Sequence, residues 1–208
     1  MNAAEFHSAG VRGFLHRADG PHALVLAHGA GSDCRSPLLV AAAHAFSDAG
    51  FSVLRCDLPF RQARPQGPPG PGDASRDRAG LASAAGELRA MVPGRVFLGG
   101  HSYGGRQASM LAAEQLESAD GLLLLSYPLH PPRQPNQLRT SHFPGLSAPA
   151  LFVHGLRDPF GSPEEMRAAL ALLRGRSELL LLPGGHHLPG FAAASPQVVL
   201  AFRTLLSL

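Results

Sequence analysis

The sequence VFLGGHSYGG, residues 96–105, decides the fold of this chain. Its centre is Gly-His-Ser-Tyr-Gly, in which Ser102 is flanked at two residues' distance by Gly100 and Gly104. An apolar run precedes this pentad, and residues 106–116 have a helix-forming composition. A Gly-x-Ser-x-Gly turn between a strand and a helix is a nucleophile elbow, which lifts the serine hydroxyl clear of the sheet and leaves room only for glycine beside the bend. The context therefore favours a nucleophilic Ser102 over an ordinary glycine turn.

A serine nucleophile of this type is followed along the chain by an acid and then by a histidine, each placed after a later strand. Residues 150–154 are an apolar run that opens into a turn containing Asp158. No Asp or Glu occurs between Gly121 and Arg157, so an acid after the preceding strand is excluded. We predict Asp158 as the acid, against the alternative that it merely caps the helix beginning near Pro163.

Two adjacent histidines compete for the role of base. The apolar run 178–182 is followed by Pro-Gly-Gly-His-His, which ends in His186 and His187 on a glycine-rich loop. We expect His187 to be the base, because Pro-Gly-x-x-His is the usual pattern at this point and His186 fills the variable place before it. The alternative is that both histidines are simply solvated. The order serine, acid, histidine after three strand ends favours the catalytic interpretation.

Hydrolysis through a serine also needs backbone donors for the oxyanion of the tetrahedral intermediate. One donor is the N–H of the residue after the nucleophile, Tyr103. The other comes from the loop after an earlier strand, and residues 23–27 followed by His-Gly-Ala-Gly-Ser at 28–32 fit that description. We assign the second donor to the Ala30 N–H, against the alternative of an ordinary glycine-rich strand-to-helix turn.

The remaining histidines and glycines near these motifs are expected to shape the loops. We assign this role to His28, Gly29 and Gly31 in the first loop, and His101 in the elbow is expected to be structural. The chain has 11 histidines, but none shows the helical spacing or the cysteine pairs of a zinc site, so no metal is expected. A phosphate-binding loop is excluded as well, because its Gly-Lys-Ser/Thr signature needs a lysine and the chain has none.

These motifs, taken in order, resemble those of the α/β-hydrolase superfamily, and the match spans nearly the whole chain. More narrowly the chain resembles the small, lidless dienelactone-hydrolase-like branch. Residues 124–132 together with 28–31 are similar to a sub-branch whose animal members include a testis-expressed hydrolase-like protein and a chromatin acetyltransferase-complex subunit. The resemblance implies a serine hydrolase that cleaves a small ester, lactone or thioester through an acyl-enzyme on Ser102, without a cofactor.

Two alternatives to this function stay open. Some members of the animal sub-branch serve as scaffolds, so a non-catalytic interaction module with the same fold is one alternative. The other is a peptidase or amidase that uses the same three residues. The complete set of serine, acid and histidine argues against the first alternative, because a module without activity would be expected to lose at least one of them.

Length and composition favour a single domain without a separate lid over residues 1–208. The chain is 45% hydrophobic, enough for one substantial core. All 18 basic residues are arginines, and they are scattered rather than clustered, so we expect a small-molecule acyl substrate and no nucleic-acid partner. The oligomeric state is not indicated.

The expected location is the cytoplasm. The only cysteines, Cys34 and Cys56, fit free thiols in a reducing compartment. The first seven residues lack the basic and apolar regions of a signal peptide. No apolar run approaches the roughly 20 residues that a membrane span requires, so no membrane partner is expected.

Apolar runs of four to six residues alternate with helical stretches, which predicts an α/β fold with three α/β/α layers. The sheet is expected to be mostly parallel and doubly wound, with about seven strands. We predict residues 65–72, rich in proline and glycine, as a surface connector, with a mobile flap beside the site as the alternative. Residues 127–148 are expected to form the substrate-facing wall. Strands are predicted near 11–16, 23–27, 52–56, 95–99, 122–126, 150–154 and 178–182, and helices near 36–49, 77–91, 106–117, 163–174 and 196–206.

Overall fold

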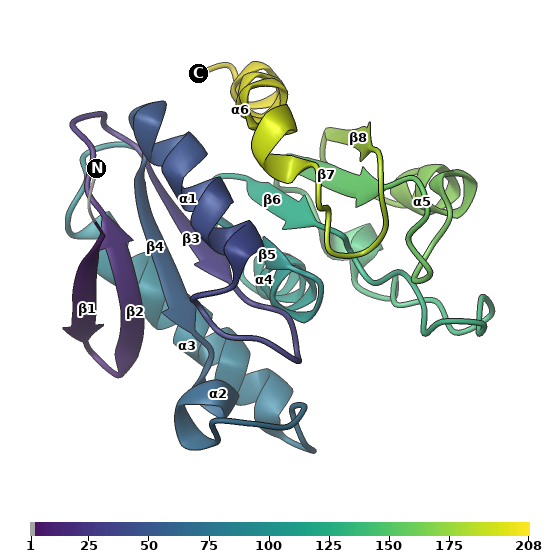
Figure 1. Cartoon of the computed structure of the whole chain (residues 1–208), viewed down its shortest axis with the longest axis horizontal. Coiled ribbons are helices and arrows are strands. Elements are labelled where there is room, and N and C mark those ends of the chain that lie inside the picture. Colours follow the sequence, from purple (N-terminus) through teal and green to yellow (C-terminus); the bar gives the residue numbers. More distant parts are fainter. Residues whose placement is uncertain (1–2) are drawn as a thin grey trace.

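The computed structural model describes residues 3–208, and the strands in this range form one eight-stranded sheet (Figure 1). The strands are β1 (Ala4–Ser8), β2 (Val11–His16), β3 (Ala23–Ala27), β4 (Ser52–Asp57), β5 (Val96–His101), β6 (Leu122–Leu125), β7 (Ala150–Gly155) and β8 (Ser177–Leu182). Their order across the sheet is β1-β2-β4-β3-β5-β6-β7-β8. The β1–β2 and β2–β4 pairs are antiparallel, and every other pair is parallel.

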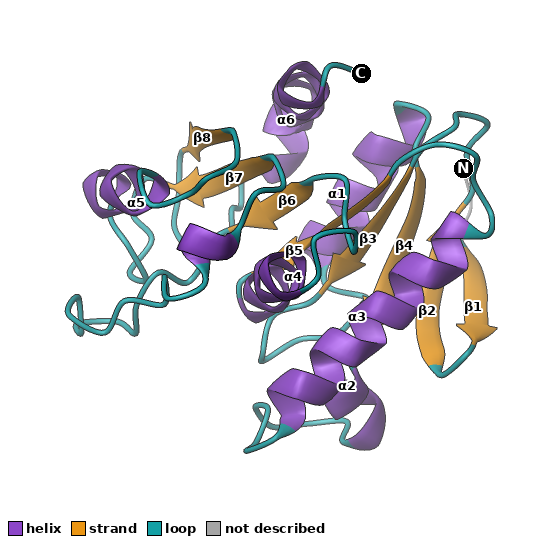
Figure 2. Cartoon of the chain, turned by 180° about the vertical axis from the view of Figure 1, so that it is seen from behind, coloured by secondary structure: helices purple, strands orange, loops and turns teal. Residues whose placement is uncertain are grey.

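Helices cover both faces of this sheet. Helices α1 and α6 lie together on one face, and α3 and α4 lie together on the other (Figures 1 and 2). The helices are α1 (Pro37–Asp48), α2 (Pro59–Ala63), α3 (Asp73–Arg89), α4 (Tyr103–Glu114), α5 (Pro163–Leu170) and α6 (Phe191–Leu206), with a short 3₁₀ turn η1 (Phe143–Gly145). The predicted three-layer, mostly parallel architecture is therefore confirmed, with eight strands where about seven were expected.

The extra strand is β1, which pairs only with β2 at the edge of the sheet. Its five residues do not alternate between buried and exposed side chains, and only Phe6 is buried. A strand that packs one side chain against the core has little of the hydrophobic periodicity by which strands are predicted. The short helix α2 was not predicted either.

Three helices begin earlier than the sequence suggested. Helix α3 begins at Asp73, directly after Gly72, and the Asp73 carboxylate accepts the Gly70 N–H at 2.6 Å. Helix α4 begins directly after Ser102. Helix α6 begins at Phe191 and continues through Pro196, which has no N–H for the Ala192 carbonyl. The Ser195 hydroxyl donates to that carbonyl at 2.9 Å, so the helix tolerates the proline.

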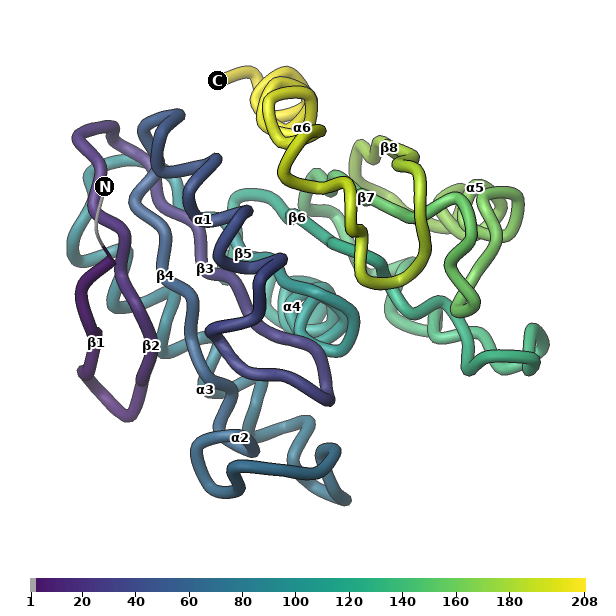
Figure 3. The backbone as a smooth tube through the Cα atoms, viewed as in Figure 1, coloured from purple at the N-terminus to yellow at the C-terminus, as the bar shows by residue number. Residues whose placement is uncertain are grey.

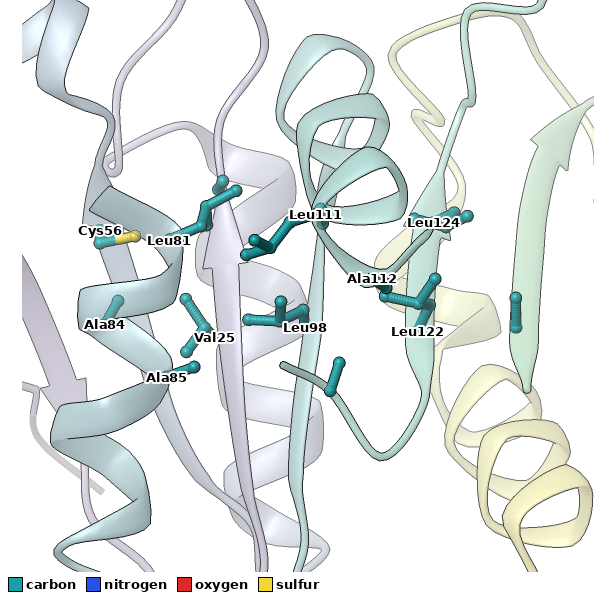
Figure 4. Packing of buried hydrophobic residues seen from close by; sticks show 14 of the residues in the cluster. Val25, Cys56, Leu81, Ala84, Ala85, Leu98, Leu111, Ala112, Leu122 and Leu124 are labelled. Carbon is teal, nitrogen blue, oxygen red and sulfur yellow. The ribbon is translucent and has the colours of Figure 1, made fainter. Parts of the chain in front are cut away.

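Aliphatic side chains fill the space between the sheet and helices α3 and α4 (Figure 4). Leu81 of α3 and Leu111 of α4 are buried in this layer with Val25 of β3 and Leu98 of β5. Fully burying one such side chain stabilises the fold by about 1.5–3 kcal/mol. The two strands whose ends carry the predicted elbow and oxyanion loop are thus held on a well-packed layer.

Phenylalanines dominate the opposite layer, under α1 and α6. The ring of Phe202 on α6 packs edge-to-face on Phe46 of α1 and Phe97 of β5, with ring centroids 5.2 Å apart in both pairs. Such pairs add about 0.5–1.5 kcal/mol beyond the area they bury. Because β5 is packed from both faces, its carboxyl end is a rigid support for whatever follows it.

The loops that follow β3, β5, β7 and β8 all leave the same edge of the sheet, because these strands are parallel. Figure 3 follows the chain from β3 into α1 and from β8 into α6, and both connections turn at this edge. In doubly wound sheets, ligands bind outside the carboxyl ends of the strands. This edge is where the predicted functional residues gather.

Candidate active site

Ser102 lies at a sharp bend between β5 and α4. Its φ is +50° and its ψ −114°, a backbone conformation that a residue with a side chain rarely adopts. Strain of this kind costs about 1–3 kcal/mol and is concentrated at functional sites. A Cβ atom at Gly100 would lie 2.3 Å from the Ala27 carbonyl oxygen, and one at Gly104 would lie 2.6 Å from the same atom. The bend therefore requires glycine at both positions.

A chain of hydrogen bonds joins Ser102, His186 and Asp158. The Nδ1 atom of His186 lies 2.8 Å from Oδ2 and 3.0 Å from Oδ1 of Asp158, and its Nε2 atom lies 2.8 Å from the Ser102 hydroxyl oxygen. A carboxylate only accepts, so Nδ1 carries the proton and the neutral ring accepts the serine O–H at Nε2. This is the geometry of a serine nucleophile with its general base and an orienting acid.

The prediction that His187 would make these contacts is wrong. Its ring centroid lies 5.9 Å from that of His186 and 5.9 Å from that of His101, and it has no hydrogen bond to Ser102 or Asp158. The physical reason is the tightness of the loop. The Arg157 N–H donates to the Gly184 carbonyl at 2.8 Å, which continues the pairing of β7 with β8 past the ends of both strands. The histidine that reaches Ser102 is therefore His186, one residue before the one we expected.

Asp158 is buried, and several donors stabilise its charge. It accepts the Phe160 N–H at 2.9 Å in addition to the two contacts from His186. Burial alone would raise the pKa of Asp158, but the hydrogen bonds and the neighbouring imidazoles outweigh burial and lower the pKa below its usual value. Asp158 is therefore an ionised carboxylate that faces Nδ1 of His186.

Two aromatic side chains hold the His186 ring in place. The Phe160 ring stacks on it with centroids 4.2 Å apart and an interplanar angle of 33°. The His101 ring lies at 5.0 Å, and its Nε2 donates to the His186 carbonyl oxygen at 2.9 Å. Burial lowers the pKa of His101 to about 4, so this ring is neutral at pH 7. His101 thus fixes the loop that carries His186.

His28 organises the loop after β3. The Leu58 N–H donates to its Nε2 at 3.1 Å, so the proton of the neutral ring is on Nδ1, which donates to the Gly29 carbonyl at 2.8 Å. Burial lowers the pKa of His28, which keeps this tautomer neutral. Because the C=O and N–H of one peptide point in opposite directions, a Gly29 carbonyl that is held this way turns the Ala30 N–H away from His28.

The backbone donors predicted for the oxyanion are available to a ligand. Among residues 3–208, neither the Ala30 N–H nor the Tyr103 N–H has a hydrogen-bond acceptor, and Tyr103 is the first residue of α4, where no intrahelical partner exists. The Tyr103 side chain is fixed by a 2.7 Å bond from its hydroxyl to the buried carboxylate of Asp77, which also accepts the Phe60 N–H at 3.0 Å.

A pocket of about 590 Å³ opens beside Ser102. Its walls carry no Arg, Asp or Glu side chain, and its apolar surface comes from Phe160 and from the first turn of α1. The lining residues are Gly29, Ala30, Gly31, Ser32, Ser36, Pro37, Leu38, His101, Ser102, Phe160, His186 and His187. The pocket therefore has room for an uncharged, partly apolar group.

The expectation that residues 127–148 form the substrate-facing wall is wrong, since none of them lines this pocket. The loop instead packs on itself and on the turn after β7. The Tyr127 hydroxyl donates to the Arg139 carbonyl at 2.6 Å, and the His130 N–H donates to the Phe160 carbonyl at 3.0 Å. The loop supports Phe160 from behind. Residues 65–72 do not line the pocket either.

Sequence reasoning missed Phe160 and residues 36–38 as parts of the site. Phe160 is two residues after Asp158, in a turn whose direction depends on the Phe160 N–H bond to that carboxylate. Residues 36–38 begin α1, where Ser36 caps the helix by accepting the Leu39 N–H. The Ser-Pro start of a helix is visible in the sequence, but which pocket it borders is not.

Within residues 3–208, no three His, Cys, Asp or Glu side chains are grouped closely enough to bind a metal ion. None of the helices in the same range is long and apolar enough to cross a lipid bilayer.

The chain is similar to several known proteins. A family model described as an alpha/beta hydrolase domain matches residues 20–194. The fold is similar to that of Est1E from Butyrivibrio proteoclasticus, with a TM-score of 0.78 and 15% identity over 100% of both chains. A dienelactone hydrolase from Anabaena variabilis ATCC 29413 has a TM-score of 0.74 and 24% identity over 97% of both chains. TT1662 from Thermus thermophilus has the same score and identity over 100% of both chains.

Proposed function

This chain belongs to the alpha/beta hydrolase domain family, and from that premise we propose that it is a serine hydrolase with Ser102 as nucleophile, His186 as general base and Asp158 as the orienting acid. Family membership supports a hydrolase in general. The finer assignment is supported by one observation above all, the hydrogen-bonded chain from Asp158 through His186 to the strained Ser102.

In the proposed reaction the Ser102 oxygen attacks an acyl carbonyl while Nε2 of His186 takes the hydroxyl proton. The imidazolium that forms is stabilised by the ionised Asp158 at Nδ1. When the tetrahedral intermediate collapses, His186 gives its proton to the leaving oxygen or sulfur and the acyl group stays on Ser102. A water molecule, deprotonated by His186, then attacks the acyl-enzyme and restores the serine.

The oxyanion of the intermediate would be bound by the N–H groups of Ala30 and Tyr103. Both donors are free among the described residues, and both belong to segments at the pocket. Donors that are fixed before the reaction stabilise the developing charge without reorganisation, and loss of one costs about 10²–10³ in kcat.

The substrate class proposed is an ester, lactone or thioester with a small, uncharged acyl group. The pocket of about 590 Å³ and its lack of Arg, Asp and Glu support this class over substrates with a charged acyl chain. We further propose that residues 1–208 act as one domain with no separate lid, that no cofactor takes part, and that the enzyme works in the cytoplasm.

Labelling with a fluorophosphonate probe tests this function, together with turnover of p-nitrophenyl esters of graded acyl length. We expect stoichiometric labelling, lost in Ser102→Ala, and the highest kcat/KM for short, uncharged acyl chains. Turnover by Ser102→Ala at the wild-type rate would overturn the mechanism. A folded wild-type protein that is neither labelled nor active on esters or thioesters would favour the non-catalytic interaction module instead, and activity on amides alone would favour the peptidase alternative. The similarity to the animal sub-branch stays a prediction.

A further inference from the structure

Arg61 is a buried arginine on α2 with an unusual set of partners. The residue is 6% exposed, yet it forms no ion pair with any carboxylate in residues 3–208. All its hydrogen bonds go to main-chain carbonyl oxygens. A buried arginine is ordinarily paired with a carboxylate, so a guanidinium whose hydrogen bonds go only to peptide groups, beside a cation–π contact 4.9 Å from the Phe60 ring centroid, needs an explanation.

Two of these carbonyls belong to the loop that borders the pocket. Nη2 of Arg61 donates to the Ala30 carbonyl at 3.0 Å, and Nε donates to the Ser32 carbonyl at 2.9 Å. Arg61 itself does not line the pocket, whereas Ala30, Gly31 and Ser32 do. The guanidinium therefore contacts the loop from the side away from the substrate.

The direction of each peptide follows from these contacts. In a trans peptide the C=O and N–H point in opposite directions, so the Ala30 carbonyl that faces Arg61 turns the Gly31 N–H away from Arg61. His28 does the same for the preceding peptide, whose carbonyl it binds and whose N–H is that of Ala30. Two consecutive N–H groups are thus oriented by a buried side chain behind each peptide. Neither N–H has an acceptor among the described residues.

The other two carbonyls anchor the guanidinium to the proline- and glycine-rich segment. Nη1 donates to the Arg64 carbonyl at 3.2 Å, and Nη2 donates to the Gly67 carbonyl at 3.0 Å. Asp73 fixes that segment in turn, through the Gly70 N–H and the Arg64 side chain. The segment does not cover the pocket, but it holds Arg61 against the back of the loop.

We propose that Arg61 is a positioning residue for the oxyanion hole: its guanidinium holds and polarises the peptide between Ala30 and Gly31, so that the Gly31 N–H supports the oxyanion beside the Ala30 N–H that His28 orients. This rests on the proposed function. The positive charge lies at the carbonyl end of the peptide between Ala30 and Gly31, two residues that line the pocket, and hydrogen-bonded groups polarise one another in a low dielectric. No carboxylate in ion-pair contact offsets that charge in the described part of the chain.

The test compares Arg61→Gln and Arg61→Lys with Arg139→Gln as the matched control. Arg139 also donates to a backbone carbonyl, that of Pro128 at 3.3 Å, without touching the pocket. We expect Arg61→Gln to lower kcat for a p-nitrophenyl ester about 10²-fold, the loss that a 1 Å misplacement causes, with KM changed less than about threefold. Arg61→Lys, which keeps the charge but not the fork of donors, should lose about tenfold.

A second readout separates the oxyanion hole from general stability. A trifluoromethyl ketone that forms a tetrahedral adduct with serine should bind Arg61→Gln weaker by a factor similar to the loss of kcat, and should bind Arg139→Gln as it binds the wild type. Thermal unfolding of both variants shows whether they are equally folded. If Arg61→Gln does not fold, Arg61→Lys carries the same comparison.

Wild-type kcat and wild-type ketone affinity in a folded Arg61 variant would overturn the role of Arg61 and leave the proposed hydrolase standing. A loss of similar size in a folded Arg139→Gln would also overturn it, because the effect would then not be specific to the loop. A wild-type protein that shows neither labelling nor turnover would instead overturn the proposed function, and the inference with it.

Discussion

The Nε2 atom of His186 lies 2.8 Å from the hydroxyl oxygen of Ser102, a distance over which a proton passes directly between the two groups. The residues come from loops 84 positions apart in sequence. Each is held by its own local structure, the serine by the bend after β5 and the histidine by the turn after β8. The hydrogen bond between His186 and Ser102 is therefore set by the backbone that positions both residues.

Replacing the two adjacent histidines one at a time tests which of them is the base. His186→Ala should lower kcat/KM for a p-nitrophenyl ester by several orders of magnitude, because no other imidazole in residues 3–208 is hydrogen-bonded to Ser102. His187→Ala should keep most of the activity and change at most KM, since His187 borders the pocket without a hydrogen bond to the serine. The reverse ranking, in proteins of equal thermal stability, would return the assignment to His187.

Replacing Asp158 by Asn tests the acid. The amide nitrogen cannot accept the Nδ1 proton, so the imidazole would be driven into the wrong tautomer. We expect kcat to fall about 10⁴-fold while KM changes little, as steady-state kinetics with a short-chain ester would show. A loss below tenfold would mean that another group orients His186.

The strained serine predicts an unusual stability ranking. At φ +50° and ψ −114°, any side chain is disfavoured, whereas glycine adopts the conformation freely. Ser102→Gly should therefore be more stable to urea than Ser102→Ala, by about 1 kcal/mol, although both are inactive. Ser102→Ala keeps the Cβ and is the matched control. Equal unfolding midpoints would mean that the bend stores no strain.

Buried neutral histidines predict that the protein loses stability in mild acid. Burial lowers the pKa of His101 and of His16 to about 4, against about 6.5 in an unfolded chain. Between these values the unfolded state binds protons that the folded state does not, so the free energy of unfolding falls as the pH drops from 6.5 toward 4. The slope is at most about 1.4 kcal/mol per pH unit for each histidine.

Urea unfolding at pH 7 and at pH 5 measures this dependence. His16→Gln should show a shallower loss between the two values, because the amide oxygen can still accept the Arg55 Nε–H that His16 accepts at 3.1 Å, but no longer titrates. Equal stability of the wild type at both pH values would contradict the neutral buried state of these rings.

Much of the fold and part of the site could be predicted from the sequence. The Gly-x-Ser-x-Gly pentad predicted the bend correctly, because the bend leaves no room for a Cβ atom at two positions and the sequence has glycine at both. The family is confirmed as well, since it was predicted from motifs whose order the sequence displays, and so is the mostly parallel sheet, which was predicted from the order of apolar runs. The choice between His186 and His187 failed because it depends on how far strand pairing continues past β8, a tertiary contact with Arg157.

The prediction of the pocket walls was wrong for a related reason. Residues 127–148 were predicted to face the substrate from their length and composition, but the contacts of Tyr127 and His130 turn the loop onto the outside of the site. The role of Arg61 could not be predicted from any sequence motif, because its hydrogen-bond partners are main-chain carbonyls, which every residue type has. Contacts of this kind become visible only when the backbone is placed.

The fit of the elbow against the oxyanion loop can be tested at two glycines. A Cβ at Gly104 would lie 2.6 Å from backbone atoms of Ala27 and His28, which cannot move aside without shifting β3, whereas a Cβ at Gly31 would meet nothing within 4 Å. Gly104→Ala should therefore be destabilised by about 1–3 kcal/mol or fail to fold, and Gly31→Ala should unfold close to the wild-type midpoint. Differential scanning fluorimetry of both variants gives the comparison, and equal melting temperatures would mean that the elbow is not packed this tightly against β3.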